Sequence, residues 1–378
     1  MKKSLIKFSI IFFNFLYFFF KFIPQKKIIT ILSRQSDQSS IDIEMIKEDL
    51  NNNLPDYKVI VLCKKLEGNI IKKSLYFFHI LKQMYYISQS KLLILDSYCI
   101  TASMLKHKTN IQIIQIWHAL GLMKKAGYSI LDKKEGRSKD IALTAKMHHN
   151  YTYAITSSEH CIKSMSKVYN INEDKILVYK LPRVDYLINN KDRIGKEIKN
   201  KYTNLNDKKN ILYIPTHRKG NDEFDKEINV IIDTIDFKKY NLIIKLHPLS
   251  NIDITNPNVT MLDDIKTVDT LFIADYVITD YSTICYEAMI LNIPVYFYAF
   301  DLEQYTHDRD FFIDYKKDLK DNYYLDFKKL YKSLDNNKFN FKKQETLLKQ
   351  QVDLSADKIS DFVIKTLKGN NLENSERN

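Results

Sequence analysis

The sequence predicts an α/β protein built from two doubly wound units, preceded by an apolar and basic N-terminal segment. Short apolar runs alternate with helical segments along the chain, which is typical of parallel strands joined by crossover helices. A polar stretch rich in Lys and Asn, residues 189–210, separates an earlier set of such runs from a later one. At 378 residues the chain is long enough for two domains, and its 45% apolar residues exclude general disorder.

Residues 1–25 differ in composition from the rest of the chain. The first 27 residues contain six lysines and no acidic residue, and they enclose an apolar core from Phe8 to Phe20. That core is shorter than the about 20 residues that a membrane span needs, and no small-residue cleavage site follows it. We therefore expect this segment to lie in or dip into the cytoplasmic leaflet, with a true span as the alternative.

The first doubly wound unit is expected over residues 26–190. Strands are predicted at 27–32, 57–62, 91–95, 111–116 and 153–155, with helical periodicity over 41–50 and about 70–88. The strand at 111–116 leads directly into Trp117 and His118.

Residues 191–209 are the predicted linker, and the second unit is expected over 210–340. Its strands are predicted at 211–214, 241–246, 276–279 and 295–298. Residues 341–368 are expected to form a terminal helical segment, followed by a polar tail over 369–378.

In both units, polar residues follow directly after the predicted strands. Ligands of doubly wound sheets bind outside the carboxyl ends of the strands. Two such units in tandem therefore predict an enzyme whose ligands occupy a cleft between them.

Two histidines at strand ends are the candidate catalytic groups. His118 follows Trp117, and Gly121 permits close backbone approach soon afterwards, so Trp117 and Gly121 are candidate substrate contacts beside it. His247 in LIIKLHPL follows a strand of the second unit, and Lys245, two residues earlier, is expected on the same side. The alternatives are a structural histidine and a capped strand end with a solvated lysine.

Two arginines and a threonine are candidate phosphate contacts. Thr216 and Arg218 lie in the turn YIPTHRKG after a strand, and Arg183 lies in LPRVDYL. The planar fork of arginine suits phosphate oxygens. Taken alone, YIPTHRKG is an ordinary surface turn.

The stretch TDYSTICYEA predicts an anion site at a strand-to-helix turn. Asp280 is expected to be the N-cap, which places Ser282 and Thr283 in the first helical turn. Glu287 lies four residues after Thr283 on the same helix face, where it would reach a ribose hydroxyl. The alternative is an ordinary capped helix.

Several other classes of site lack support. The 7 glycines form neither GxGxxG nor a P-loop, and the four cysteines are scattered. The pair Asp308 and Asp310, and the histidines His148, His149 and His160, do not match metal-site positions or spacings. We expect no metal and no cofactor. The net charge of +12 fits an anionic lipid surface or phosphorylated substrates better than nucleic acid, because no basic-aromatic module is present.

Five blocks of sequence, in this order and spacing, resemble the CDP-glycerol glycerophosphotransferase family, the teichoic-acid polymerases and primases. The blocks are IQIWHALGLMKK, LPRVD, YIPTHR, IIKLHP and VITDYSTICYEAMILNIPVYFYAFDLEQY. The resemblance covers roughly residues 27 to 315. It departs from the family at Ala119-Leu120, where Gly-Thr is usual, and at His217, where an aromatic residue is common, so the polyol and the acceptor stay open.

The resemblance implies a GT-B fold, two Rossmann-like domains with the nucleotide bound mainly by the second, and no required metal. It implies transfer of glycerol phosphate, or a related polyol phosphate, from its CDP form to a lipid-linked acceptor at the cytoplasmic side of the cell membrane, with release of CMP. The family's essential histidines fall on His118 and His247. Its pyrophosphate and nucleotide contacts fall on Arg183, Thr216, Arg218, Lys245, Ser282, Thr283 and Glu287.

The predicted mechanism is attack of an acceptor hydroxyl on the β-phosphorus. His118 would be the general base, and His247 with Lys245 and Arg218 would stabilise charge on the phosphoryl oxygens and on the leaving CMP. Two alternatives remain open: a GT-B glycosyltransferase that uses a nucleotide sugar, and a membrane-surface scaffold without turnover. The oligomeric state is not predicted.

Overall fold

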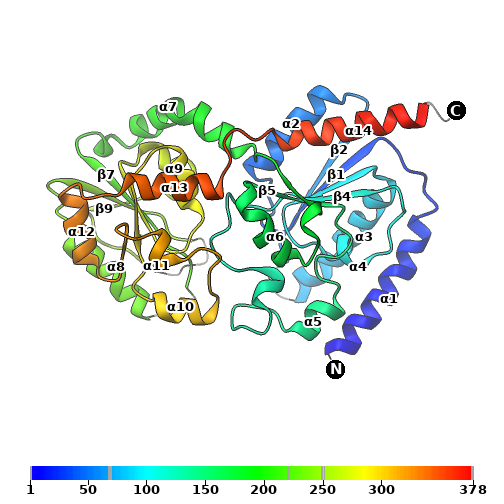
Figure 1. Ribbon diagram of the computed structural model, residues 1–378, viewed down its shortest axis with the longest axis horizontal. Helices are drawn as coiled ribbons and strands as arrows, with labels where there is room; N and C mark the ends of the chain where they lie inside the picture. The colour runs from blue at the N-terminus through cyan, green and yellow to red at the C-terminus, as the bar shows by residue number, and fades with distance from the viewer. Residues whose placement is uncertain (1, 67–69, 219–221, 248–249, 251, 376–378) are drawn as a thin grey trace. The chain divides into compact units, whose positions relative to one another are not determined.

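The computed structural model describes residues 2–66, 70–218, 222–247, 250 and 252–375, which form two compact units (Figure 1). Unit 1 comprises Met1–His118, Ala126–Arg183 and Asp353–Asn378. Unit 2 comprises Ala119–Lys125 and Val184–Val352. The chain therefore enters unit 2 directly after His118, returns to unit 1 at Ala126, and enters unit 2 again after Arg183.

Unit 1 is built on a parallel six-stranded sheet in the order β2-β1-β3-β4-β5-β6. The strands are β1 (Ile28–Ser33), β2 (Lys58–Cys63), β3 (Leu92–Leu95), β4 (Gln112–Gln115), β5 (Tyr153–Thr156) and β6 (Ile176–Val178). Every residue of β1 and β3 is buried, as expected for strands covered on both faces. The strand order reverses between β1 and β3, where doubly wound sheets bind ligands.

Helices surround this sheet and follow the apolar periodicity of the sequence. They are α1 (Lys2–Phe20), α2 (Ile41–Asn53), α3 (Ile70–Gln89), α4 (Ile100–Met104), α5 (Lys139–Thr144), α6 (Ile162–Tyr169) and α14 (Ile359–Ser375), with 3₁₀ turns η1 (Gly127–Ile130), η2 (Glu159–Cys161) and η3 (Glu173–Lys175). The hydroxyl of Ser40 caps α2 by accepting from Ile43 N at 3.3 Å. The C-terminal α14 packs beside α2, and Ser360 Oγ donates to Asp49 at 2.6 Å (Figure 1).

Unit 2 is built on a second parallel six-stranded sheet, in the order β12-β11-β10-β7-β8-β9. The strands are β7 (Lys209–Ile214), β8 (Tyr240–Ile244), β9 (Val259–Met261), β10 (Tyr276–Thr279), β11 (Val295–Tyr298) and β12 (Tyr323–Tyr324). Counted along the chain, this is the Rossmann order 3-2-1-4-5-6. Its switch point lies between β7 and β10.

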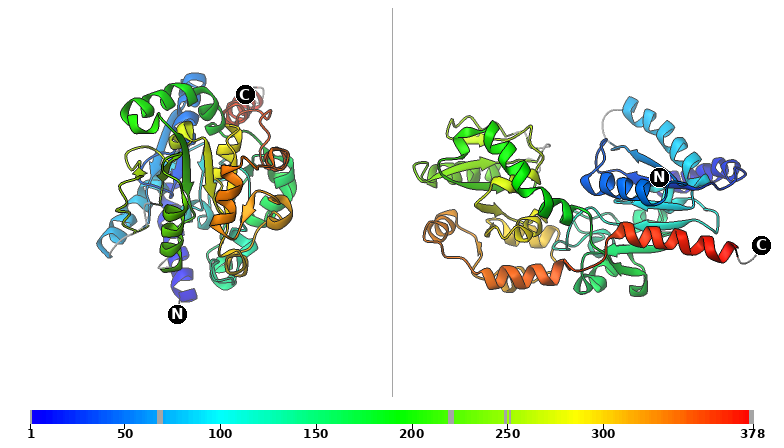
Figure 2. Two further views of the ribbon diagram at one scale, coloured as in Figure 1. Left: turned by 90° about the vertical axis from the view of Figure 1, so that its left-hand side faces the viewer. Right: turned by 90° about the horizontal axis from the view of Figure 1, so that it is seen from above.

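Helices cover both faces of this sheet (Figure 2). They are α7 (Arg183–Lys201), α8 (Asp222–Thr234), α9 (Ile284–Ile290), α10 (Leu302–Asp308), α11 (Tyr315–Asp318), α12 (Phe327–Asp335) and α13 (Phe341–Gln351), with 3₁₀ turns η4 (Thr203–Leu205) and η5 (Asp269–Ile273). On one face, side chains of α8 and α12 form a core cluster with Ile211 and Tyr213 of β7. The alternation along β7 directs the intervening Leu212 to the opposite face, where it is also buried.

Three segments differ from the sequence predictions. Most of the predicted linker 191–209 lies in helix α7. This helix is mainly polar in composition, but it has a buried stripe formed by Val184, Leu187, Gly195 and Ile198. The predicted helical segment 341–368 is two helices, α13 and α14, because the chain between them binds unit 1 through Asp353 N to Ser157 O (2.6 Å). The backbone of α14 also continues to Ser375, through most of the predicted polar tail.

Candidate active site

His118 stands at the carboxyl end of the unit 1 sheet with its imidazole oriented by the backbone. It lies in the loop that follows β4. Its Nδ1 is 3.2 Å from Asp96 O, directly after the neighbouring strand β3. A carbonyl only accepts, so this contact places the ring proton on Nδ1 and the lone pair on Nε2. The tautomer that a general base at Nε2 requires is therefore already selected.

Trp117, the residue before this histidine, has a strained backbone. Its φ is 63°, in the left-handed region that bulky residues avoid at a cost of about 1–3 kcal/mol. Its N–H donates to Gln115 Oε1 at 3.0 Å, and its ring lies 4.2 Å from the ring of His118. Gln115 is buried and donates in turn to Ser97 O at 3.2 Å. The strained residue therefore lies between the end of β4 and His118.

Arg183 fixes the backbone of His118 and is itself held by Asp42. The backbone N and Nε of Arg183 donate to the two carboxylate oxygens of Asp42 at 2.8 and 2.7 Å, and Nη2 also pairs with Asp42. Nη2 donates to His118 O at 3.0 Å. The sequence predicts Arg183 as a phosphate contact, whereas these distances describe a positioning residue. Asp42, in the first turn of α2, was not predicted; its only sequence signal is an acidic residue after the cap Ser40.

Asp96 is the second unit 1 carboxylate that sequence reasoning did not single out as functional. Its side chain is buried, and Ser33 Oγ donates to it at 2.7 Å. Burial raises the pKa of this carboxyl, and the hydrogen bond from Ser33 partly opposes the rise. Asp96 directly follows β3 and Ser33 ends β1, and these two strands flank the switch point of the sheet. Its position directly after an apolar strand is the signal that could have found it.

At the switch point of unit 2, Arg218 binds two carboxylates. Its Nε and Nη2 form a bidentate pair with Asp301 at 2.8 and 2.9 Å, and Nη1 donates to Asp280 at 2.7 Å and to Thr216 O at 2.9 Å. Burial alone would lower the pKa of Arg218, but the two carboxylates raise it. The guanidinium therefore ties together the loops that follow β7, β10 and β11. Asp301, which was not predicted, lies three residues after the end of the aromatic strand β11.

The predicted N-cap role of Asp280 is wrong. Helix α9 begins at Ile284 with Thr283 as its N-cap residue, and the Asp280 carboxylate instead accepts from Thr216 N at 2.9 Å and from Arg218. Ser282 and Thr283 therefore precede the helical turn rather than occupying it.

Of the predicted anion-binding residues in this stretch, Ser282 and Thr283 remain candidates, but without the support of a helix N-terminus. Helix α9 has seven residues, so the field at its N-terminus is small. Ser282 and Thr283 are partly exposed beside the switch point, whereas Glu287 is 3% exposed within α9. The two hydroxyls, rather than the helix end, are what a phosphate would meet.

Lys245 and His247 do not share a side, contrary to the prediction from strand alternation. Lys245 is buried and its Nζ donates to the carbonyls of Leu262 and, at 2.8 Å, Ile265, whereas His247 is exposed. Strand β8 ends at Ile244, so the alternation does not extend to either residue. Burial lowers the pKa of Lys245.

His217, where the sequence departs from the resembled family, lies against His247. The two rings are 5.1 Å apart at 31°, and His217 Nδ1 lies 3.3 Å from Ser250 Oγ. His247 therefore lies beside a second histidine ring.

Gly121 is needed for packing inside unit 2. Its φ is +57°, and a Cβ there would lie 2.7 Å from the ring of Tyr286 on α9. The neighbouring Leu122 N donates to Gln351 Oε1 at 2.7 Å. The close backbone approach predicted at Gly121 is thus an approach to Tyr286, and it fixes the segment Ala119–Lys125 on unit 2.

The discounted metal patterns are engaged in other contacts. Asp310 pairs with Lys125 at 2.5 Å, and His148 is buried with Nδ1 3.0 Å from Tyr151 OH. Across the described ranges, no group of three His, Cys, Asp or Glu side chains is arranged to hold a metal ion.

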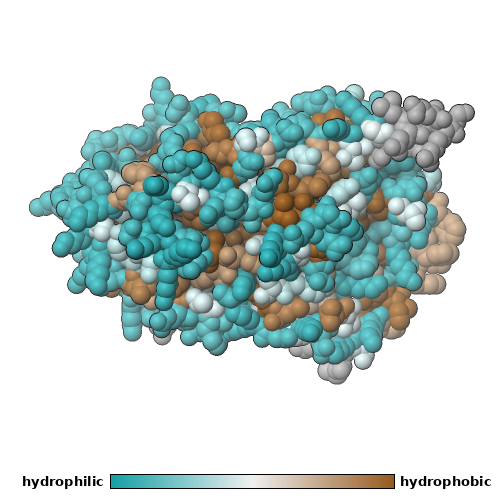
Figure 3. All heavy atoms as spheres, in the orientation of Figure 1, coloured by the Kyte–Doolittle hydropathy of each residue, from teal (hydrophilic) through white to brown (hydrophobic). Residues whose placement is uncertain are grey.

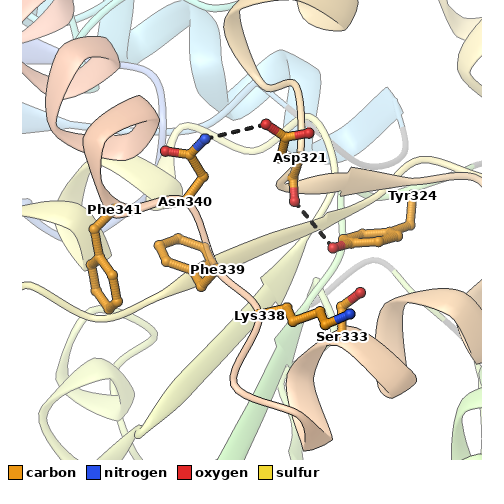
Figure 4. A pocket seen from close by; sticks show the side chains of 7 residues that line it. All are labelled: Asp321, Tyr324, Ser333, Lys338, Phe339, Asn340 and Phe341. Atoms are coloured by element: carbon orange, nitrogen blue, oxygen red, sulfur yellow. Dashed lines mark hydrogen bonds between the residues drawn. The ribbon is translucent and has the colours of Figure 1, made fainter.

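A pocket elsewhere in unit 2 is separate from these residues (Figure 4). It lies around Asp321, before β12, and Asn340, whose Nδ2 donates to Asp321 at 3.2 Å. Asp321 precedes its strand, so this pocket is at the amino edge of the sheet, opposite the edge that carries Thr216 and Asp280. We assign it no part in the site.

The comparison with known proteins decides what these residues belong to. Residues 14–365 match the sequence model of the family described as CDP-Glycerol:Poly(glycerophosphate) glycerophosphotransferase. The chain belongs to this family. Membership confirms the predicted family and the predicted enzyme class, a transferase of polyol phosphate.

Individual relatives carry both glycerol and ribitol names. The chain is 29% identical over 299 residues to the teichoic acid ribitol-phosphate primase of Bacillus spizizenii, covering 76% of this chain and 77% of the relative. It is 32% identical to the teichoic acid glycerol-phosphate primase of Bacillus subtilis, covering 61% of each. It spans 50% of the B. spizizenii teichoic acid poly(ribitol-phosphate) polymerase, at 27% identity.

A solved structure confirms the predicted GT-B-like fold. The wall teichoic acid polymerase TagF superposes with a TM-score of 0.72 at 21% identity, covering 99% of this chain and 98% of that chain. At this identity the match establishes the fold of both units and leaves the roles of individual residues to their chemistry.

Proposed function

We propose that this chain transfers glycerol phosphate or ribitol phosphate from the corresponding CDP-polyol to a hydroxyl of a lipid-linked acceptor, releasing CMP, in teichoic acid synthesis. The proposal rests on the orientation of the His118 imidazole. Its Nδ1 contacts Asp96 O at 3.2 Å, so the lone pair is on Nε2, where a base must hold it.

In the proposed mechanism, His118 Nε2 takes the proton of the acceptor hydroxyl as its oxygen attacks the β-phosphorus. A new P–O bond forms to the acceptor, and the bond from the β-phosphorus to the bridging oxygen breaks. That oxygen leaves with CMP. His247 stabilises charge on the phosphoryl oxygens or on the leaving CMP, and Ser282 and Thr283 donate hydrogen bonds to the donor phosphates.

The arginines act through other groups in this proposal. Arg183 fixes the backbone of His118 while bound to Asp42, and Arg218 fixes the loop of Asp280 while bound to two carboxylates. Lys245 donates to two backbone carbonyls, so in this proposal it also positions the chain rather than binding the substrate. The substrate contacts predicted at Trp117, Gly121, Thr216 and Glu287 stay predictions.

The decisive test is product release with defined donors. The purified chain is incubated with a lipid-linked acceptor and CDP-glycerol, CDP-ribitol or UDP-sugars, and CMP and UDP are measured. CMP release with one CDP-polyol supports the proposal and names the polyol. UDP release with a UDP-sugar instead supports the glycosyltransferase alternative, and CDP-polyol binding without turnover supports a scaffold.

We also propose that α1 holds the chain on the cytoplasmic leaflet by lying along it. Among the described residues, α1 is the one helix long and apolar enough to cross a membrane, over Lys3–Phe20. Yet Asn14 bonds Met104 O (3.0 Å) and Lys106 N (2.8 Å), and Tyr17 is buried, so one side of α1 is docked on unit 1. A helix docked in this way presents its other side to a surface instead of crossing it.

The undocked side of α1 is apolar and large. Phe8, Phe15 and Phe19 are 66%, 61% and 55% exposed, and Leu75 and Phe78 of α3 are exposed as well. Apolar residues over α1 are visible at the right of Figure 3, in the orientation of Figure 1. Burial of such side chains in the headgroup boundary, with nearby lysines on anionic lipid, would supply the binding energy.

Vesicle sedimentation tests this placement. The double variant Phe8→Glu/Phe15→Glu is expected to lose binding to vesicles that contain anionic lipid, while its melting temperature stays near that of the parent. Phe341→Glu, at a residue 57% exposed in unit 2, is the matched control and is expected to bind normally. Normal vesicle binding by the double variant would reject the placement.

A further inference from the structure

A cavity of about 650 Å³ in unit 1 has no part in the mechanism above. Its walls come from the end of α5 and the segment after it, from the residues before β5 and β6, and from the end of α6. Thr152 directly precedes β5 and Lys175 directly precedes β6, so the cavity lies at the amino edge of the sheet. His118 follows β4 and therefore lies at the opposite, carboxyl edge. A molecule in this cavity is for that reason not the one that reacts at His118.

Residues 146–150, which form one wall of the cavity, have an unusual backbone. Lys146, His148 and Asn150 have φ values of 48°, 59° and 73°, all in the left-handed region. Hydrogen bonds hold this conformation. The side-chain amide of Asn150 donates to three carbonyls in the last turn and C-cap of α4, at 2.9 to 3.2 Å, and Tyr128 OH donates to Met147 O at 2.9 Å. Strained backbone that is imposed by its surroundings is a feature of ligand sites and switch regions.

A chain of hydrogen bonds places the proton of His148, at this wall, on Nε2. Gln115 Oε1 accepts from Trp117 N at 3.0 Å, so the other end of that amide is its donor, and it donates to Tyr151 OH at 3.2 Å. The proton of Tyr151 is then left to donate to His148 Nδ1, at 3.0 Å. Burial lowers the pKa of His148 to about 3, which keeps the imidazole neutral. Nε2 therefore carries the remaining proton and is a hydrogen-bond donor.

The same hydrogen-bond chain reaches the residue before the proposed catalytic base. It runs from His148 through Tyr151 and Gln115 to the N–H of Trp117, and Trp117 directly precedes His118. Ring packing follows a parallel path. The buried ring of Tyr169 lies 4.9 Å from the ring of His148 and 6.0 Å from that of Trp117, which is itself 4.2 Å from the ring of His118. The wall of the cavity and the catalytic histidine are thus joined by two sets of contacts within unit 1.

The lining of the cavity suits an anion that accepts hydrogen bonds. Lys146 and Lys175 both line it, and among the described residues no Asp or Glu does. A neutral imidazole with its proton on Nε2 adds a donor. Phosphate oxygens are strong acceptors of hydrogen bonds from lysine and from imidazole. The volume is within the range of small-molecule sites.

The surroundings of the cavity favour a phosphate that is carried by a lipid. Leu143, which also lines the cavity, is 54% exposed and belongs to α5. Helix α5 packs beside α1, and Asp140 of α5 pairs with Lys3 of α1 at 2.5 Å (Figure 1). A cavity next to α1 lies near the surface on which α1 is proposed to rest.

We propose that this cavity binds the phosphate of a phosphate ester as an effector, which accepts from His148 Nε2 and is attracted by Lys146 and Lys175. Occupancy fixes the ring of His148, and the hydrogen-bond chain through Tyr151 and Gln115 then orders Trp117 and raises turnover at His118. The effect on turnover rests on the proposed function, whereas binding to the cavity does not. The phosphate ester is either a membrane phospholipid or a soluble molecule, and the experiment separates the two.

Trp117 reports on binding, because it is the only tryptophan of the chain. The full chain is titrated with glycerol 3-phosphate, or with vesicles of phosphatidylglycerol in phosphatidylcholine, while tryptophan emission is followed. Glycerol and vesicles of pure phosphatidylcholine are the controls without net negative charge. A saturable change in emission is expected with an anionic probe and not with its control. A response to the vesicles alone identifies a lipid effector, and a response to glycerol 3-phosphate identifies a soluble one.

Charge variants separate the cavity from general attraction to an anion. The double variant Lys146→Gln/Lys175→Gln should weaken the fluorescence response by about 10-fold or more. Lys167→Gln, at an exposed residue of α6 outside the cavity, should stay within about twofold of the parent. Sedimentation with the vesicles should show that the double variant still binds them through α1. Loss of the fluorescence response is then separate from loss of membrane binding.

A hydroxyl variant tests the connection to His118. Saturating effector should raise kcat for CMP release by about fivefold or more in the parent, because it orders the residue before the base. Tyr151→Phe breaks the hydrogen-bond chain, so it should lose this rise while its calorimetric affinity for the effector stays within about fivefold of the parent. Tyr153→Phe, at a ring that packs on Phe362 of α14, is the matched control and should keep the rise. Should Tyr151→Phe fail to fold, the double lysine variant tests the same connection, since it should lose the rise as well.

Three results would overturn the inference. The first is no change in tryptophan emission with either anionic probe. The second is an unchanged response in Lys146→Gln/Lys175→Gln, which would place the anion elsewhere. The third is calorimetric binding that leaves the kcat of the parent unchanged, which would remove the effector role. If the parent releases no CMP with any donor, the proposed function fails, and the emission and lysine results still decide whether the cavity binds phosphate.

Discussion

Replacing Asp42 with asparagine should both destabilise unit 1 and slow turnover. The carboxylate of Asp42 accepts the backbone N and Nε of Arg183 at 2.8 and 2.7 Å and also pairs with Nη2. The two side chains are 3% and 17% exposed, so the pair is largely removed from water. Asparagine keeps one acceptor oxygen but turns an N–H₂ group toward a guanidinium that has only donors.

The expected loss follows from that burial. Removing one partner of a buried pair costs about 3–5 kcal/mol, and the retained oxygen of asparagine favours the lower figure. A loss of about 3 kcal/mol lowers the melting temperature of a unit of this size by about 6–12 °C. Because Arg183 Nη2 also holds His118 O at 3.0 Å, kcat should fall by about 10- to 100-fold.

Thermal melting and steady-state kinetics of Asp42→Asn measure both effects. Asp56→Asn is the matched control, since Asp56 pairs with Lys27 at 3.0 Å on the surface of the same unit and should cost at most about 1 kcal/mol. The reasoning is refuted if Asp42→Asn melts and turns over like the parent. A raised KM for the CDP-polyol with unchanged kcat would instead make Arg183 a substrate contact, as the sequence predicts.

Three further predictions concern single residues. His118→Ala should lower kcat by about 10² or more while CDP affinity, measured by calorimetry, stays near that of the parent; near-normal turnover would mean that His118 is not the base. Gly121→Ala should lower stability by about 1–3 kcal/mol in urea unfolding, because its φ is +57° and the new Cβ would lie 2.7 Å from Tyr286; an unchanged midpoint would contradict this. Burial lowers the pKa of His148 to about 3, so the free energy of unfolding should fall by about 2 kcal/mol between pH ~6.5 and pH ~5. The variant His148→Gln should remove this part of the pH dependence, whereas His149→Gln, at an exposed site, should keep it.

Local patterns in the sequence were enough to locate nine of the twelve strands in the described part of the chain, whereas the short strands β6, β9 and β12 were not predicted. Runs such as IITIL and LLIL are apolar except for Thr30 because β1 and β3 are covered on both faces, so they can be recognised from the sequence without any knowledge of their neighbours. Helix α7 was missed for the opposite reason. Its buried stripe is carried by a few residues within a Lys- and Asn-rich stretch, which resembles a linker in composition.

The sequence by itself determined the family, the two doubly wound units and the polar residues at their strand ends, because each depends on short-range pattern or on quoted motifs. Only the tertiary structure decided what those polar residues bind. Arg183 pairs with Asp42 across 141 positions, and Arg218 pairs with Asp280 and Asp301 across 62 and 83. No local periodicity encodes a partner so distant, and a buried guanidinium takes whichever carboxylate the fold brings to it. Two arginines predicted as phosphate contacts are for that reason held by carboxylates.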